Sequence, residues 1–224
     1  PLGGIIHLDL WQTDLGLLGK VFVLGDLIVF GWVMGMMYTT KILDGLDGLT
    51  VGIVAIGALM IFFLSNYTKY YQPDIALIAL VLAGVCIGFL FLNFHPAKIF
   101  LGESGGLFLG FMLGILAVVA GGKIATALLV VAVPVLDLAR VIYVRKIKKQ
   151  PVFLGDREHL HFRLLQAGLN QKQAVLFLYA IAMLFGMTTL FFQSKQKLMA
   201  LFFLFVVMII IGIWIRVKEK KVKK

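Results

Sequence analysis

Long apolar segments separated by short polar stretches dominate the sequence. A helix that crosses the hydrocarbon core of a membrane needs about 20 predominantly apolar residues. Segments of about this length predict transmembrane helices at Leu17–Met37, Gly48–Ser65, Ile75–Leu92, Leu107–Ala120, Ile124–Val144, Ala174–Phe192 and Leu198–Val217. The fourth is short for a span and is expected to take in residues from its flanks. The pattern predicts an all-α fold: a polytopic membrane protein with about seven transmembrane helices, forming a single integral membrane domain over residues 1–224.

The composition excludes an ordinary water-soluble domain. Hydrophobic residues make up 61% of the 224 residues and charged residues 14%, whereas soluble domains contain about 45–50% apolar and about 25% charged residues. The 19 phenylalanines also exclude a disordered chain. The one cysteine, Cys86, cannot form a disulfide within the chain and does not indicate a redox compartment.

Basic residues gather in the segments that lie on one predicted side of the membrane. Thr39–Asp47, Asn93–Gly106, Arg145–Lys172 and the C-terminal tail hold fifteen of the 21 lysines and arginines, and the opposite segments hold five. Because cytoplasmic loops are enriched in lysine and arginine, the basic side is predicted to be cytoplasmic. The net charge of +10 therefore follows from membrane topology and does not predict a nucleic-acid partner.

The first cytoplasmic segment carries two carboxylates three residues apart, in Asp44-Gly-Leu-Asp47-Gly-Leu. The glycines allow a backbone, an ion or a phosphate to approach closely, and carboxylates at a membrane surface suit Mg²⁺. The alternative is a polar turn in which Asp47 caps the following helix. The spacing alone favours neither interpretation.

The second segment offers an amide, an imidazole, an ammonium and a carboxylate on Asn93, His95, Lys98 and Glu103. A Ser/Gly turn then leads into a helix, where backbone N–H groups can hold a phosphate and Glu103 can take the counter-ion. The alternative is a loop shaped by Pro96 and the glycines, with Lys98 extending to the lipid headgroups.

The third segment places His159 and His161 between Arg157 and Arg163. Histidine and arginine together favour anionic oxygens, whereas zinc is disfavoured because no cysteine and no third histidine lies nearby. The alternative is a basic loop against anionic lipid, which explains the arginines but not the histidines.

Asp137 lies inside the fifth predicted helix, beyond Pro134. A carboxylate within a membrane segment is energetically costly, which makes this residue a candidate for function. The alternative is a simple ion pair with Arg140. The sequence leaves both interpretations open.

Three ordered motifs in these segments resemble the polyprenyl-phosphate N-acetylhexosamine-1-phosphate transferases, also called glycosyltransferase family 4. The resemblance covers the chain from about Thr39 to Gln173. The form of the third motif is similar to the branch that uses UDP-N-acetylglucosamine and undecaprenyl phosphate. The motifs are Asp44-Gly-Leu-Asp47-Gly-Leu, Pro96-Ala-Lys98-Ile-Phe-Leu-Gly102-Glu103-Ser104-Gly105 and Asp156-Arg157-Glu158-His159-Leu-His161.

The resemblance implies an enzyme of the bacterial cytoplasmic (inner) membrane that initiates envelope glycans such as teichoic acid or lipopolysaccharide. The implied reaction is UDP-sugar plus polyprenyl phosphate giving polyprenyl-diphospho-sugar plus UMP, with Mg²⁺, or alternatively Mn²⁺, as cofactor. The lipid phosphate oxygen attacks the β-phosphorus of the donor, a step that needs charge neutralisation and in-line positioning more than covalent chemistry. A homodimer is a further expectation.

The resemblance also implies roles for individual residues. Asp44 and Asp47 are the catalytic candidates that order the metal and diphosphate, and Asp47 and Glu103 are the metal candidates. The substrate-binding candidates comprise Asn93 at the nucleotide, three residues at the donor diphosphate, and a lysine of the second motif. These last four are His159, His161, Arg163 and Lys98.

This sequence departs from the family pattern at Lys41, Glu103 and Phe162, where the family has asparagine, aspartate and histidine. The family's upstream paired-aspartate motif has no counterpart before Asp44. We therefore expect the chain to be the C-terminal part of a transferase of about eleven helices. The alternatives are a non-catalytic paralogue that binds polyprenyl phosphate, a phospho-N-acetylmuramoyl-pentapeptide transferase, and a small transporter; the transporter is disfavoured because no internal repeat is present.

Overall fold

The computed structural model describes residues 12–14, 20–67, 71–121, 123–147, 149, 159–191 and 194–222. Within these ranges the chain is almost entirely helical, which confirms the predicted fold class. The exceptions to helix include two three-residue strands, β1 (Gln12–Asp14) and β2 (Lys20–Phe22), which pair antiparallel. The helices are α1 (Val23–Leu43), α2 (Leu49–Tyr67), α3 (Pro73–Asn93), α4 (Gly102–Val119), α5 (Ile124–Ile147), α6 (Leu160–Gln166), α7 (Gln171–Phe191) and α8 (Ser194–Val222).

Six of the described helices, α1 to α5 and α7, are long and apolar enough to cross a membrane. They match six of the seven predicted spans. The seventh, Leu198–Val217, lies within the helix α8, where the described residues include the apolar segment Met199–Trp214. The fourth span takes in residues from its N-terminal flank, as expected, because α4 begins at Gly102.

The first predicted span, Leu17–Met37, is wrong in its bounds. The helix begins at Val23, after β2, and continues to Leu43. Its polar end stays helical because two hydroxyls bond carbonyls of the same helix: Thr39 Oγ1 donates to Gly35 O (2.7 Å) and Thr40 Oγ1 to Met36 O (3.0 Å). Such bonds satisfy polar side chains inside an apolar helix.

Small residues let α4 pack closely on α1. A Cβ atom at Gly110 would lie 2.2 Å from Thr40 Oγ1 and 2.6 Å from Met36 O, so only glycine permits this approach. Gly114 lies one turn along the same face, and its carbonyl accepts a hydrogen bond from Trp32 Nε1 (3.1 Å). Glycines four residues apart are typical of close helix contacts within membranes. This contact places the end of α1 beside the start of α4.

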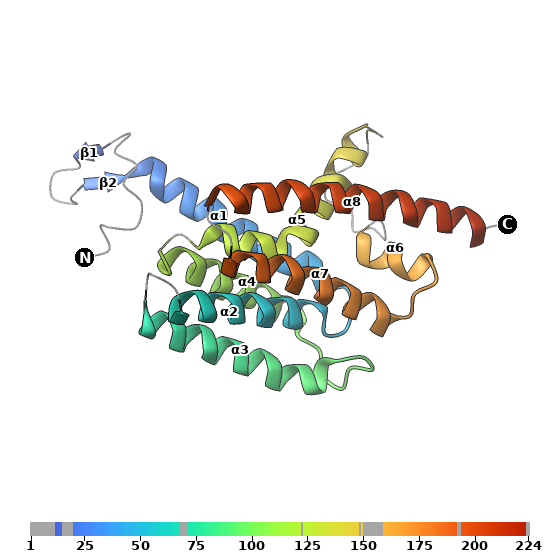
Figure 1. Ribbon diagram of the computed structural model, residues 1–224, viewed down its shortest axis with the longest axis horizontal. Coiled ribbons are helices and arrows are strands. Elements are labelled where there is room, and N and C mark those ends of the chain that lie inside the picture. The colour runs from blue at the N-terminus through green and yellow to red at the C-terminus, as the bar shows by residue number, and fades with distance from the viewer. Residues whose placement is uncertain are drawn as a thin grey trace.

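Successive spanning helices run in alternating directions, so the chemically interesting loops meet at one end of the bundle (Figure 1). The α1–α2 turn, the α3–α4 loop and α6 all lie at the end where α1 finishes. The opposite end is joined differently: Lys123 Nζ donates to Ser65 Oγ (2.8 Å) and to Gln72 Oε1 (3.2 Å). Polar contacts thus tie the loops together at both ends of the bundle.

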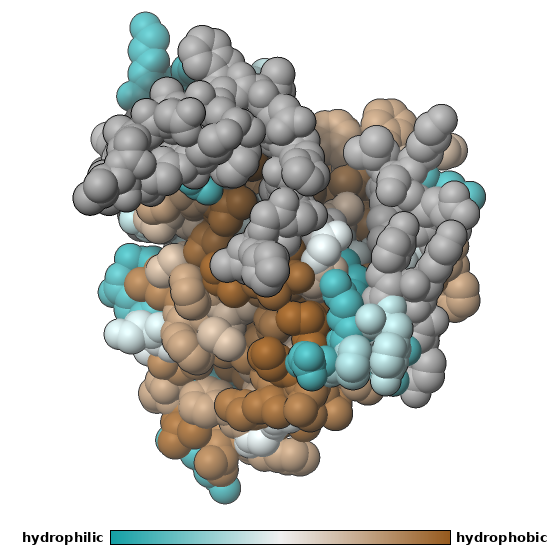
Figure 2. Space-filling view, turned by 90° about the vertical axis from the view of Figure 1, so that its left-hand side faces the viewer, coloured by the Kyte–Doolittle hydropathy of each residue, from teal (hydrophilic) through white to brown (hydrophobic). Residues whose placement is uncertain are grey.

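The outer surface of the bundle is rich in large apolar side chains. On α3, Leu77, Val81 and Val85 are each more than half exposed, whereas α2 lies at the centre with most of its side chains buried. Figure 2 views the bundle from the end where α1 begins, and brown and tan apolar groups form most of the coloured surface in this view, with smaller teal groups beside them. An exposed apolar surface of this extent suits contact with lipid and confirms an integral membrane protein.

Candidate active site

Two of the predicted loops are bonded directly to each other. Asp47 Oδ2 lies 2.8 Å from His95 Nδ1 and accepts a hydrogen bond from the backbone N–H of Ala97 (3.2 Å). Close by, Lys41 at the end of α1 forms an ion pair with Glu103 in the first turn of α4. The first and second motifs therefore form one structural unit.

The turn between α1 and α2, residues 44–48, is held from two further sides. Gly48, at φ +80°, donates its N–H to Asn93 Oδ1 (3.1 Å), and its carbonyl accepts from the hydroxyl of Tyr179 on α7. Asn93 is 4% exposed, and its Nδ2 also donates to Ile99 O (2.9 Å). Both ends of the Asn93 amide are therefore engaged within the protein, so this residue fixes the position of the carboxylate turn.

Asp44 is the more exposed of the two carboxylates in this turn. Protein atoms on one side of the carboxyl group remove part of its hydration and raise its pKa, and the charge of Asp47 raises it further. A hydrogen bond from Thr50 acts in the opposite direction. Asp44 thus presents a solvent-accessible carboxylate at this end of the bundle.

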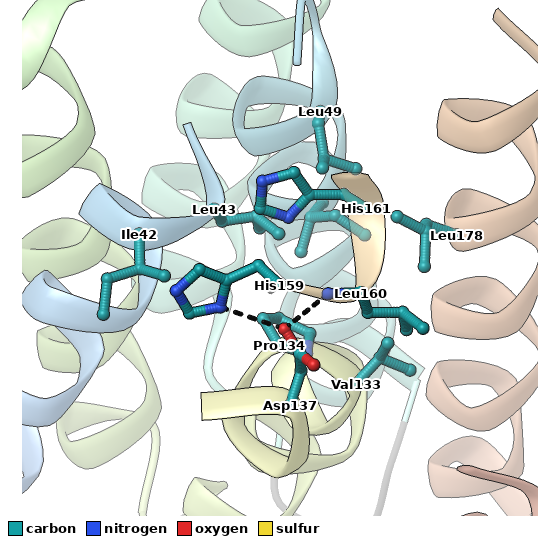
Figure 3. Close-up of a pocket in the computed structure, with 11 residues that line it drawn as sticks. Ile42, Leu43, Leu49, Val133, Pro134, Asp137, His159, Leu160, His161 and Leu178 are labelled. Carbon is teal, nitrogen blue, oxygen red and sulfur yellow. Dashed lines mark hydrogen bonds and ion pairs between the residues drawn. The ribbon is translucent and has the colours of Figure 1, made fainter. Parts of the chain in front are cut away.

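The third motif is attached to α5 through Asp137. Asp137 Oδ2 accepts from the backbone N–H of Leu160 (2.8 Å) and lies 3.0 Å from His159 Nδ1, while Oδ1 accepts from Arg140 Nη2 (2.9 Å) and Nε (3.1 Å). Figure 3 shows the first two contacts converging on the carboxylate. Asp137 therefore forms the predicted ion pair with Arg140, and it also organises the histidine loop.

His161 connects the third motif to the first. Its side chain points at the α1–α2 turn so closely that a Cβ atom at Gly45 would lie 2.3 Å from Nε2. Nε2 is buried and has no hydrogen-bond partner in the described part of the chain. The pKa of His161 is lowered to about 4, mainly by burial and also by the charge of His159, while Asp137 opposes the shift. His161 is thus a neutral packing group at neutral pH.

The two histidine rings lie nearly parallel, with centroids 5.8 Å apart and planes 3° apart. They line a cavity of about 20 Å³ together with apolar side chains of α1, α2, α5 and α7 (Figure 3). This volume is close to that of one water molecule. The cavity is therefore too small to enclose a sugar nucleotide.

The remaining predicted residues lie farther out or face another cavity. Lys98 is exposed in the α3–α4 loop. Arg163 is 9% exposed on α6 and, with Arg140, lines a mainly apolar cavity of about 620 Å³ between α5 and α8. Asp156, Arg157 and Glu158 of the third motif lie outside the described residues. The structure thus brings together the first two motifs and the histidines, while Arg163 faces the α5–α8 cavity.

The described residues do not fit a metal site built from protein ligands alone. They contain no group of three histidine, cysteine, aspartate or glutamate side chains placed to share an ion. Of the metal candidates, Asp47 has one oxygen bonded to His95 and Ala97, and Glu103 is paired with Lys41. Mg²⁺ takes one or two carboxylates and completes its shell with water and phosphate oxygens, so binding here would depend on groups from elsewhere.

Sequence reasoning assigned no role to two residues that support the site. The first is His95, which bonds Asp47, and the second is Tyr179, which bonds Gly48. His95 had a signal, since its imidazole lies in the second segment, directly before the second motif. Tyr179 had none, because a tyrosine in an apolar helix ordinarily indicates an interfacial or core position.

Comparison with known proteins shows the family. The pattern described as glycosyl transferase family 4 matches residues 5–121. The chain is 34% identical over 188 residues to the probable undecaprenyl-phosphate N-acetylglucosaminyl 1-phosphate transferase of Bacillus subtilis (strain 168), covering 81% of this chain and 52% of that protein. It is 35% identical over 225 residues to the decaprenyl-phosphate N-acetylglucosaminephosphotransferase of Mycobacterium leprae (strain TN), covering 88% and 53% respectively.

A second group of relatives matches a smaller part of the chain. The phospho-N-acetylmuramoyl-pentapeptide-transferase of Chlamydia pneumoniae is 39% identical over 117 residues, which covers 51% of this chain and 31% of that protein. The chain spans about half the length of the Bacillus and Mycobacterium relatives. The family predicted from the three motifs is confirmed: the chain belongs to glycosyl transferase family 4.

Proposed function

We propose that this protein transfers N-acetylglucosamine 1-phosphate from UDP-N-acetylglucosamine to a polyprenyl phosphate such as undecaprenyl phosphate. The products are polyprenyl-diphospho-N-acetylglucosamine and UMP. The observation that carries the proposal is the joining of the Asp44–Gly48 turn to the other two motifs at one end of the bundle, through His95, Asn93 and His161. The names of the Bacillus and Mycobacterium relatives support the choice of donor and lipid.

The proposed roles follow the positions of the residues in the three motifs. Asp44 and Asp47 order the diphosphate region of the donor, and Lys98 and the protonated ring of His159 donate to phosphate oxygens. Arg163 would reach a phosphate only by leaving the α5–α8 cavity. Asn93 would contact the nucleotide only by exchanging one of its two internal hydrogen bonds. His161 acts by packing against the turn, unless the turn moves away from it.

A divalent cation is the cofactor expected for this family, and we propose Mg²⁺, with Mn²⁺ as the alternative. When bound, the cation would neutralise charge on the transferred phosphoryl group. Asp44, Asp47 and Glu103 are the residues of this chain that would contribute oxygens. Because they form no closed cluster, the diphosphate of the donor would supply part of the coordination shell.

The side of the membrane also belongs to the proposal. Fifteen of the 21 basic residues lie in segments at the site end of the bundle or in the tail, which favours a cytoplasmic site in a bacterial inner membrane. A UDP-sugar is soluble and charged, and it would reach the site from that compartment. The envelope glycan that the product would initiate and the expected homodimer both stay predictions.

The relatives named phospho-N-acetylmuramoyl-pentapeptide-transferase support a second candidate function, transfer from UDP-N-acetylmuramoyl-pentapeptide. A third candidate is a non-catalytic protein that binds polyprenyl phosphate, and the ion pair of Lys41 with Glu103 favours it because the pair occupies a metal candidate. The UDP-sugar that the protein consumes distinguishes the two transferase candidates. Consumption of neither donor would favour the non-catalytic candidate.

The experiment measures transfer of radiolabelled sugar phosphate into undecaprenyl phosphate, using membranes that carry the complete reading frame of this chain. We expect incorporation from UDP-N-acetylglucosamine that requires the divalent cation and is lost in Asp44→Asn. The control is Asp74→Asn, the same change on an exposed aspartate at the opposite end of the bundle. Incorporation only from UDP-N-acetylmuramoyl-pentapeptide would support the second candidate. Binding of the lipid without transfer would support the third.

A further inference from the structure

Asp137 receives more hydrogen bonds than an ion pair with Arg140 requires. Its side chain is 5% exposed, and each of its two oxygens contacts two donor atoms at 2.8–3.1 Å. Oδ1 faces Arg140, one turn along α5, and Oδ2 faces His159 and Leu160 in the histidine loop. One buried carboxylate thus holds together two parts of the chain that are more than 20 residues apart.

The contact with His159 determines which ring nitrogen carries hydrogen. Oδ2 already accepts the backbone N–H of Leu160 and acts as an acceptor, so Nδ1 of His159 is the donor at 3.0 Å. Nε2 is then left on the side of the ring away from Asp137 (Figure 3). In the neutral ring Nε2 is a hydrogen-bond acceptor, and in the protonated ring it is a donor.

The contact with Leu160 holds the start of α6. His159 is the residue before the helix, and its side chain makes no capping bond. The carboxylate of Asp137 takes the place of a local cap by accepting the N–H of Leu160 from a different helix. Asp137 therefore fixes the helix that carries His161 and Arg163.

A continuous path of contacts leads from Asp137 to the carboxylate turn. The His159 ring lies parallel to the His161 ring, and Nε2 of His161 abuts Gly45, the neighbour of Asp44. Because the His161 side chain is buried and packed against Gly45, a shift of α6 would displace His161 against the turn. The position of Asp44 thus depends on the position of α6.

We propose that Asp137 is a positioning residue for the transfer reaction: it binds the Nδ1–H of His159, so that the protonated ring presents Nε2–H to the donor diphosphate. This inference rests on the proposed function. Asp137 touches no substrate and acts through His159 and α6. A simple ion pair with Arg140 would leave the tautomer and orientation of His159 unspecified.

The conservative variant Asp137→Asn distinguishes a positioning role from a simple ion pair with Arg140. An amide has one acceptor oxygen and one donor nitrogen. If the oxygen faces Arg140, the amide nitrogen opposes the N–H groups of Leu160 and His159; if the group flips, it opposes Arg140. The variant keeps the shape of the side chain and loses about half of its hydrogen bonds.

The first test reads the tautomer directly. The chain contains four histidines, so ¹⁵N labelling of histidine in the full chain gives a small set of ring-nitrogen signals, and His159→Gln identifies the signal of His159. We expect the neutral ring to carry hydrogen on Nδ1, and Asp137→Asn to change that signal. A neutral ring with hydrogen on Nε2 instead of Nδ1 in the unmodified protein would overturn the proposal, even if the variant fails to fold.

The second test measures kinetics with each substrate varied in turn. We expect Asp137→Asn to lower kcat/KM for the UDP-sugar by about 10- to 100-fold, as for other residues that orient a functional histidine, with the KM for polyprenyl phosphate changed less than about two-fold. In a His159→Gln background the same change should have no further effect, because residues that act through each other are not additive. Asp74→Asn is the matched control and should be neutral.

Two results of the kinetic test would overturn the proposal. One is an unchanged kcat/KM in a folded Asp137→Asn protein. The other is that Asp137→Asn lowers kcat/KM by the same factor in the unmodified and the His159→Gln backgrounds. If the unmodified protein transfers no sugar phosphate, the proposed function fails; the ring-nitrogen spectra still decide whether Asp137 sets the tautomer of His159.

Discussion

Asp137 and Glu103 both lie at the site end of the bundle, and each pairs with a basic side chain, but their surroundings differ. The Asp137 side chain is 5% exposed and accepts from three residues. The Glu103 side chain is 66% exposed and pairs with Lys41, which is 40% exposed. Water can replace a partner of Glu103 but not one of Asp137. The buried group therefore maintains the architecture, and the exposed group is available to a ligand.

The largest expected effect is on stability in Asp137→Ala. The change leaves Arg140, His159 and the N–H of Leu160 without their shared acceptor. Breaking a buried ion pair in this way typically lowers the free energy of unfolding by about 3–5 kcal/mol. Unfolding of the purified protein in mixed micelles measures this loss. Asp74→Ala, at an exposed position, is the control. An equal loss of unfolding free energy in both variants would contradict the conclusion that the buried carboxylate of Asp137 maintains the architecture.

A second prediction concerns pH and His161. Its pKa is about 4 in the folded chain and 6.5 ordinarily, so between these values the unfolded chain binds a proton that the folded chain does not. The free energy of unfolding therefore rises as the pH increases from about 4 to 6.5, by up to about 3 kcal/mol from this group. Above that range its contribution is constant.

The measurement compares stability at several pH values for the unmodified chain and for His161→Gln. The difference between the two curves isolates this side chain from the other titrating groups. We expect the slope between pH 4 and pH 6.5 to be smaller in the variant. Parallel curves would show that His161 is accessible to protons in the folded protein.

A third prediction distinguishes the roles of Asn93 and Lys98, two substrate-binding candidates in the segment Asn93–Gly106. Asn93→Ala leaves Gly48 N and Ile99 O without partners and should lower the free energy of unfolding by about 1–3 kcal/mol. Lys98→Ala removes an exposed side chain and should lower transfer activity without changing stability. Unfolding in micelles and the transfer assay test both variants. A stable Asn93→Ala protein with a raised KM for the UDP-sugar would instead make Asn93 a nucleotide contact.

The bundle itself was predictable because its signals are local. Apolar length predicted six of the helices that can span a membrane, and the order of the three motifs predicted the family. The end of α1 was missed because Thr39 and Thr40 satisfy their hydroxyls within the helix, which hydropathy does not register. Helix α6 was missed because seven residues are too few to show a helical period.

The contacts within the site were harder to predict, since they join distant residues. The sequence marked Asp137 as unusual but offered Arg140, three residues away, as a sufficient partner. The contact with His159 spans 22 positions and depends on how the chain returns after α5. Tyr179 and Gly48 are 131 positions apart, and neither residue type indicates the other. Such pairs can be identified only when the packing of the helices is known.

The smallest expected effect on stability is at Lys41 and Glu103, and it gives the sharpest separation of architecture from function. Lys41→Gln and Glu103→Gln break the same exposed ion pair, so neither should shift the midpoint of thermal unfolding. Their effects on cation-dependent transfer should differ: Glu103→Gln removes a candidate cation ligand and should lower activity, with a weaker response to added Mg²⁺, whereas Lys41→Gln releases that carboxylate and should not. Equal activity in the two variants would remove Glu103 from the metal candidates. An equal loss of activity in the two variants would instead show that transfer depends on the ion pair itself. This exposed contact would then have a structural role like that of Asp137.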